Sequence, residues 1–199
     1  MSSQNKPVSK RRRKRIRLRG WDYSNGGAYF VTICTYKRGF TFGQVTNSRM
    51  ILNAWGQIVA KSWNAIPNHF DVIELDEFIC MPNHVHMILW IVDENIDVGQ
   101  RQAFANIELR HASTLPTQSG IKPKSLNAAV GSFKSAVTKE INELRGEKHP
   151  AIWQPRFHDR IIRNERELHA IRAYIRNNPQ NWTQDRDYHA GLDLVLQNI

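Results

Sequence analysis

The order of elements in this 199-residue sequence predicts an α+β protein with the ferredoxin-like split βαβ arrangement, an antiparallel sheet with helices packed on it. Four segments rich in β-branched and aromatic residues alternate with segments whose apolar residues recur every three or four positions, in the order β-α-β-β-α-β-α. The second and third of these strands are joined by only three residues. So short a link cannot cross the sheet, so the two strands must form an antiparallel hairpin.

The first half of the chain supplies a strand, a helix and this hairpin. Residues 28–36 (AYFVTICTY) are a predicted strand, and residues 40–45 are read as a short irregular extension of it. An apolar stripe then predicts a helix that ends at Pro67, formed by Leu52, Trp55, Val59, Trp63 and Ile66. The hairpin comprises residues 72–80 and 84–92.

The second half begins with residues 93–124, whose weak periodicity predicts an inserted loop with a short helix near 102–109. A stripe of buried positions over residues 126–144 predicts the longest helix, which Gly146 ends. Residues 152–162 are the fourth predicted strand, and Pro155 within it indicates an edge position or a bulge.

A last helix is predicted from its start signal. Asn164 is suited to cap its N-terminus, and Glu167, three residues later, is the partner expected in a capping box. Pro179 ends this helix, and residues 183–199 are read as a polar tail with a possible amphipathic turn near 192–196. The predicted organisation is therefore a basic arm (1–20), one domain (21–182) and this tail.

The net charge of +10 resides almost entirely in the N-terminal arm. Nine of the 28 lysines and arginines lie in residues 1–20, which contain no acid. A block of like charge remains solvated, and its usual partner is nucleic-acid phosphate. A tail that only improves solubility is the alternative. The arm residues proposed to bind DNA are Arg11, Arg12, Arg13 and Arg15.

Composition excludes several classes of protein. No apolar run approaches the roughly 18 residues of a membrane span, and no apolar segment follows the basic arm as it would in a signal peptide. The two cysteines, Cys34 and Cys80, lack the CxxC spacing of a zinc ribbon. A cytoplasmic protein without a membrane partner is expected.

Two histidines at the start of the third strand are the first candidate for chemistry. Alternate residues of a strand share a face, so His84 and His86 project together. Two imidazoles on one rigid face can bind a metal ion if a third ligand arrives from elsewhere. The alternative is that one histidine caps the turn while the other is a hydrogen-bonded core residue.

The last helix contains a second candidate group. Tyr174 and Asn178 are four residues apart and therefore share a helix face. The tyrosine hydroxyl can act as a nucleophile, and the asparagine oxygen can ligate a hard metal ion. The alternative is that Tyr174 is an amphipathic core residue and Asn178 an ordinary helix C-cap.

Several motifs in this order resemble a known family. The segment 81–89 (MPNHVHMIL) is similar to the HUH signature, histidine-hydrophobe-histidine, of single-tyrosine transposases. Segments 131–137 (GSFKSAV), 153–162 (WQPRFHDRII) and 174–179 (YIRNNP) resemble the REP-associated tyrosine transposases of that superfamily. The resemblance covers roughly residues 20–182.

This resemblance implies a metal-dependent endonuclease on single-stranded DNA that cleaves near hairpins and rejoins strands, as in DNA transposition and recombination at REP palindromes. It implies that Tyr174 is the catalytic nucleophile and that His84, His86 and Asn178 are the metal ligands, Asn178 standing where insertion-sequence relatives typically have glutamine. A bacterial, nucleoid-associated protein is expected.

The residue types agree with this chemistry. A phenol of pKa about 10 is protonated at neutral pH, so it needs electrophilic help from a divalent ion at the phosphate. Mg²⁺ is expected from its abundance, and mixed imidazole and amide ligands would suit Mn²⁺ equally well. Arg156 and Arg160 of the fourth strand, together with Lys134, are further candidates for DNA binding.

A protein of the same fold that binds hairpin DNA for regulation without cleaving it is the rival hypothesis. The sequence leaves open whether the protein is a monomer or a homodimer. It also leaves open whether the tyrosine serves its own subunit or a partner, and which DNA sequence is recognised.

Overall fold

The computed structural model describes residues 26–92, 124–146, 151–185 and 188. The predicted basic arm, the helix near 102–109 and the turn near 192–196 lie outside the described residues. The expected limits of the domain therefore stay predictions.

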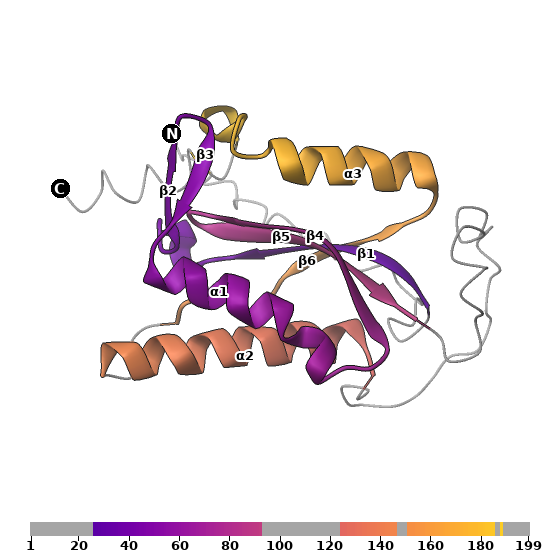
Figure 1. Ribbon diagram of the computed structural model, residues 1–199, viewed down its shortest axis with the longest axis horizontal. Coiled ribbons are helices and arrows are strands. Elements are labelled where there is room, and N and C mark those ends of the chain that lie inside the picture. Colours follow the sequence, from indigo (N-terminus) through magenta and orange to yellow (C-terminus); the bar gives the residue numbers. More distant parts are fainter. Residues whose placement is uncertain (1–25, 93–123, 147–150, 186–187, 189–199) are drawn as a thin grey trace, which may run out of the picture.

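A four-stranded antiparallel sheet forms the centre of the molecule (Figure 1). Its strands lie in the order β4-β5-β1-β6 and comprise β1 (Gly27–Cys34), β4 (Ile73–Met81), β5 (His84–Ile91) and β6 (His158–Ile162). Strands β4 and β5 form the predicted hairpin, and β1 pairs with β5 and β6. This is the strand order of a split βαβ unit, and the predicted fold class is confirmed.

Helices cover both faces of the sheet. Helices α1 (Ala54–Asn64) and α2 (Leu126–Arg145) lie on one face, and α3 (Glu165–Asn177) lies on the other (Figure 1). The residues of strand β5 explain this arrangement, because successive side chains lie alternately in two apolar cores, one on each face of the sheet. Val85, Met87, Leu89 and Ile91 belong to the core of the α1/α2 face, whereas Ile88 belongs to that of the α3 face. His84 and His86 are in step with Ile88 and therefore lie on the α3 face.

The predicted start of α3 is confirmed in detail. The side chain of Asn164 accepts a hydrogen bond of 2.8 Å from the backbone N–H of Glu167. The Glu167 carboxylate in turn accepts one of 2.9 Å from the N–H of Arg163. The first bond satisfies a donor that the first helical turn would otherwise leave unpaired, and the second ties Glu167 to the residue before the N-cap, so together they fix where α3 begins.

The fourth strand is shorter than predicted. Its regular part starts only at His158, and the residues before it make a single bridge, between Trp153 and Thr35. Pro155 has no N–H to donate to a sheet ladder, which accounts for the interruption.

A small hairpin replaces the predicted irregular extension after β1. Strands β2 (Gly43–Thr46) and β3 (Arg49–Leu52) pair around Asn47 and Ser48, both of which have left-handed backbones with φ of 50° and 58°. Gly43 is required here, because a Cβ atom at that position would lie 2.1 Å from the carbonyl oxygen of Ile51.

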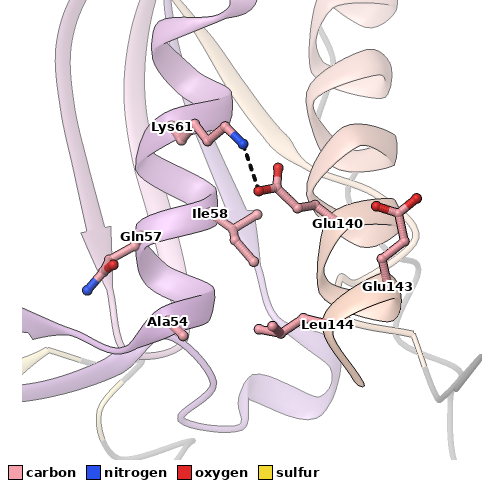
Figure 2. A pocket seen from close by; sticks show the side chains of 7 residues that line it. All are labelled: Ala54, Gln57, Ile58, Lys61, Glu140, Glu143 and Leu144. Atoms are coloured by element: carbon pink, nitrogen blue, oxygen red, sulfur yellow. Dashed lines mark hydrogen bonds and ion pairs between the residues drawn. The ribbon is translucent and has the colours of Figure 1, made fainter. Parts of the chain in front are cut away.

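A groove runs between α1 and α2 on the face of the sheet opposite α3 (Figure 2). An exposed ion pair of 2.8 Å between Lys61 and Glu140 crosses it, and Leu144 lines it further along α2. The sheet separates this groove from the two histidines. In the part of the chain that the structure describes, no helix has both the length and the hydropathy to cross a membrane.

Candidate active site

The two histidines form a close, buried pair at the start of β5. His84 is 0% exposed and His86 4% exposed, and the centres of their rings lie 4.4 Å apart. The short turn from β4 and the alternation of the strand bring both rings to the α3 face, as the sequence predicted.

A hydrogen bond fixes the proton of His84. Its Nδ1 lies 2.9 Å from Oδ1 of Asn83, and the other end of that amide donates a 3.1 Å bond to the carbonyl oxygen of Arg38. Because Oδ1 only accepts, Nδ1 of His84 carries the proton and Nε2 keeps its lone pair.

The His84 ring is also kept neutral. Burial, and secondarily the positive charge of Arg38, lower the pKa of His84 to about 3, although an interaction with the side chain of Asn178 opposes this shift. A neutral imidazole with a free lone pair is the form that binds metal ions.

His86 links the sheet to α3. Its Nδ1 lies 2.8 Å from Oγ1 of Thr32, the residue directly opposite it on β1. Its Nε2 lies 3.3 Å from the hydroxyl oxygen of Tyr174. The hydroxyl of Thr32 can accept a hydrogen bond from the N–H at Nδ1 of His86. In that tautomer Nε2, the atom that faces the tyrosine, keeps its lone pair.

Tyr174 and Asn178 approach the histidines from α3. The Tyr174 ring contacts His86 with ring centres 5.2 Å apart, and it meets Phe30 edge-on at 6.1 Å. Its side chain remains 45% exposed. Asn178, just past the end of the helix, is 2% exposed, and its Oδ1 is shielded from solvent. The structure therefore brings the four predicted residues together within one chain.

A β-bulge in the edge strand helps to hold α3 in place. The pairing of β4 with β5 shifts register between Leu75 and Phe78, and the bulge carries Asp76 and Glu77. A bulge places an extra residue on one strand and redirects its side chains, here towards α3. No sequence pattern indicated this irregularity.

Both bulge carboxylates bind arginines of α3. Arg172 contacts Asp76 through two bonds, Nε to Oδ1 at 2.8 Å and Nη2 to Oδ2 at 2.5 Å, and Arg176 lies 2.9 Å from Glu77. Tyr174 lies between these two arginines in the sequence. Two ion pairs thus flank the tyrosine and hold its helix against the edge of the sheet.

Asp76 has a second side-chain partner that strengthens this attachment. The indole N–H of Trp90 donates a 2.9 Å bond to Oδ2 of Asp76. Burial alone would raise the pKa of Asp76, but the bonds from Arg172 and Trp90 outweigh burial, and the pKa lies below its usual value. The carboxylate is therefore ionised at neutral pH and hydrogen-bonded to both Arg172 and Trp90.

The other residues predicted to contact DNA differ in exposure and in their partners. Arg156 is exposed, whereas Arg160 forms an ion pair with Glu167, the capping residue of α3. The ammonium group of Lys134 donates to the carbonyls of Gln154 and Pro155 at 2.7 and 3.3 Å, and burial lowers its pKa. The roles of these three residues in DNA binding stay predictions, and the four arm arginines lie outside the described residues.

Sequence patterns missed the residues that support the site: Thr32, Arg38, Asn83, Asp76, Trp90 and Arg172. Only Asn83 had a local signal, since it directly precedes His84 in a tight turn. The contact of Thr32 depends on strand register, and those of Asp76 and Arg172 depend on residues 96 positions apart.

No protein-family model matches the chain. An uncharacterized protein of Haemophilus influenzae is 34% identical over 176 residues, which cover 88% of this chain and 93% of that protein.

Among solved structures, a REP-associated tyrosine transposase bound to a REP hairpin aligns with a TM-score of 0.52 at 18% identity, covering 81% of this chain and 71% of that one. A weaker similarity, with a TM-score of 0.41 at 17% identity over 81% of this chain and 95% of the other, is to a candidate transposase of Deinococcus radiodurans. The chain belongs to one family with the Haemophilus influenzae protein and has the fold of a REP-associated tyrosine transposase.

Proposed function

We propose that this protein is a single-strand DNA endonuclease and strand transferase that uses Tyr174 as its nucleophile and a divalent metal ion as its cofactor. The observation that supports this best is the position of the Tyr174 hydroxyl, 3.3 Å from Nε2 of His86 and beside a second buried histidine. A tyrosine that only filled the core would bury its ring, whereas this one is 45% exposed.

The residues present fit a metal ion. His84 keeps its Nε2 lone pair, and Nε2 of His86 lies 3.3 Å from the Tyr174 hydroxyl. The side chain of Asn178 interacts with His84, and its carbonyl oxygen is buried. Among the described residues no three His, Cys, Asp or Glu side chains form such a group, so an amide is the natural third ligand. His84, His86 and Asn178 would hold Mg²⁺ or Mn²⁺.

The bound ion would polarise the scissile phosphate and offset the negative charge that develops on it. The remaining steps involve Tyr174 and the DNA strand. The Tyr174 oxygen attacks phosphorus and loses its proton, the bond from phosphorus to the 3′ oxygen breaks, and that oxygen leaves as a hydroxyl after gaining a proton. The DNA remains attached through a 5′-phosphotyrosine bond, which a 3′-hydroxyl can attack to rejoin the strand without ATP.

Attachment of α3 to the sheet is part of this mechanism. The ion pairs from Arg172 to Asp76 and from Arg176 to Glu77 limit the movement of the helix. A nucleophile held close to its target gains rate because little orientational freedom is lost in the transition state.

Single-stranded DNA next to a hairpin is the proposed substrate. The transposase of similar fold was solved bound to a REP hairpin. For Tyr174 to attack, one phosphate of the DNA must reach both the tyrosine and the metal ion. An unpaired strand is flexible enough to bring a phosphate to this position.

The test is an adduct assay. Purified protein is incubated with end-labelled DNA in which single strands flank a hairpin, with Mn²⁺ or Mg²⁺, and is separated on a denaturing protein gel. A labelled adduct that needs metal and is lost in Tyr174→Phe, but not in the control Tyr188→Phe, is expected. Hairpin binding without an adduct on any of several substrates would favour the non-cleaving regulatory protein.

A further inference from the structure

The segment that follows β1 contacts the turn between β4 and β5, which directly precedes His84 in the sequence. Cys34, the last residue of β1, lies opposite His84, and the next N–H, that of Thr35, donates a 2.9 Å bond to the carbonyl oxygen of Asn83. We call residues 36–40, with the sequence YKRGF, the β1 loop.

Hydrogen bonds to the histidine turn make the β1 loop rigid. The Thr35 hydroxyl lies 2.8 Å from the carbonyl oxygen of Gly39 and 3.0 Å from that of Asn83. Beyond the loop, the N–H groups of Thr41 and Phe42 lie 2.7 and 3.0 Å from the carbonyl oxygen of Pro82. Loop and turn therefore form one unit.

The backbone of the β1 loop is strained within this unit. Lys37 and Arg38 have φ of 51° and 60°, in the left-handed region that side chains with a Cβ atom rarely adopt. The side chain of Asn83, which orients His84, donates to the Arg38 carbonyl and holds this conformation. Such strain persists where surrounding contacts impose it, commonly beside functional sites.

The β1 loop carries two cationic side chains, Lys37 and Arg38, between two aromatic ones. Tyr36 is 45% exposed and Phe40 37% exposed, whereas Phe42 just beyond is fully buried. Lys37 lies over the ring of Tyr36, with its Nζ 5.6 Å from the ring centre, and the charge of Arg38 reaches His84.

A continuous row of ring contacts joins the loop to the tyrosine. Phe40 contacts Trp182, and Trp182 contacts His84, with ring centres 5.8 Å apart in each pair. His84 and His86 are 4.4 Å apart, and His86 and Tyr174 are 5.2 Å apart. The histidine and Trp182 rings of this row are buried, so only its two ends, Tyr174 and the β1 loop, are open to a bound strand.

We propose that the β1 loop is a binding site for the unpaired nucleotide that flanks the scissile phosphate, with its base on Tyr36 or Phe40 and its phosphate near Lys37 and Arg38. Exposed aromatic rings interleaved with cations match a single strand, because every base offers a face for stacking and every nucleotide carries one negative charge. The inference rests on the proposed function, whose substrate it specifies further.

Binding of DNA by the full-length Tyr174→Phe protein, which cannot cleave by the proposed route, tests the proposal. Fluorescence anisotropy compares a hairpin with a single-stranded flank and the same hairpin without a flank. Tyr36→Ala combined with Phe40→Ala is expected to weaken binding of the flanked hairpin about tenfold or more. Binding of the blunt hairpin should stay unchanged.

Two matched variants separate this site from general damage. Ile51→Ala with Leu144→Ala removes two other exposed apolar side chains and should change neither affinity. Tyr36→Trp with Phe40→Trp keeps both aromatic faces and should restore binding of the flanked hairpin. An alanine pair that binds the flanked hairpin as tightly as its parent, or loses affinity equally for both DNAs, overturns the proposal.

The binding assay tests the β1 loop independently of the adduct assay, which tests cleavage. If wild-type protein forms no adduct but the alanine pair still loses the flanked hairpin selectively, the loop site stands and the nuclease fails. If wild-type protein forms the adduct while the alanine pair binds both DNAs normally, the nuclease stands and the loop site fails.

Discussion

The two faces of the sheet differ in what holds them together. The face under α1 and α2 carries an apolar core that extends from Tyr29 and Val31 of β1 to Phe133 and Val137 of α2. The face under α3 has a smaller core, centred on Ile88 and Ile175, and beside it lie buried histidines and ion pairs. One face therefore contains most of the apolar core, while the other can hold polar groups for chemistry.

The largest expected effect is on the apolar face. Phe133→Ala removes a ring that is 2% exposed and packs against Trp153, and it should lower the free energy of unfolding by about 3–5 kcal/mol. Denaturant titration measures this change. The matched control, Leu144→Ala, alters a 60% exposed residue of the same helix and should have almost no effect. A comparable loss in both variants would show that burial in the apolar core does not account for the effect of Phe133→Ala.

On the polar face, Asn178→Ala should affect chemistry far more than folding. Loss of the proposed third ligand is expected to reduce adduct formation by about 10- to 100-fold, while Asn178→Gln, which retains a ligating oxygen, should recover much of it. A second readout is thermal: Mn²⁺ should raise the Tm of wild-type protein and raise that of Asn178→Ala less. Equal metal responses in the two proteins would remove Asn178 from the ligand set.

The attachment of α3 should couple stability to activity. Asp76→Asn leaves Arg172 with a weaker, neutral partner, and a loss of about 1–3 kcal/mol is expected because both groups are mostly buried. Adduct formation should fall as well, since the tyrosine helix is less firmly held. Asp71→Asn, which alters an exposed ion pair with Lys124, is the control and should be nearly silent. Unchanged adduct formation in a destabilised Asp76→Asn protein would show that the attachment is only structural.

Acidification should weaken the polar face by a smaller amount. The folded-state pKa of His84 is about 3, below its ordinary value of 6.5, so the unfolded chain binds one more proton between these values. Stability from this residue is therefore complete above pH 6.5 and declines as the pH falls.

For one such group, the free energy of unfolding of metal-free protein should drop by about 1.4 kcal/mol between pH 7.5 and 5.5. Urea titrations at the two pH values measure the drop, and His84→Asn should reduce it. If the variant and the wild type show the same pH dependence, His84 is not the titrating group.

The contrast between the faces also explains what could be predicted from the sequence. The main strands and helices were predictable because apolar periodicity is local, and the pairing of His84 with His86 follows from alternation on one strand. The hairpin of β2 and β3 was missed because Asn47-Ser48 is a weak turn signal. The strand 152–162 was overestimated because Pro155 breaks the ladder earlier than the residue types suggest.

The support of the candidate site could not be predicted for a different reason. Spacing along α3 brings Tyr174 and Asn178 to one face, but it does not indicate which strand they meet. The bonds of Arg172 to Asp76 and of Thr32 to His86 join distant parts of the chain, and they depend on a bulge and on strand register that no local pattern encodes.

Mass spectrometry of the covalent adduct tests the central claim most directly. Trypsin should release the peptide 173–176 (AYIR), and the account predicts a nucleotide linked through phosphate to Tyr174 in that peptide, formed only when Mg²⁺ or Mn²⁺ is present. A nucleotide attached to any other residue, or an adduct that forms equally well in EDTA, would contradict a metal-assisted tyrosine nucleophile at this site.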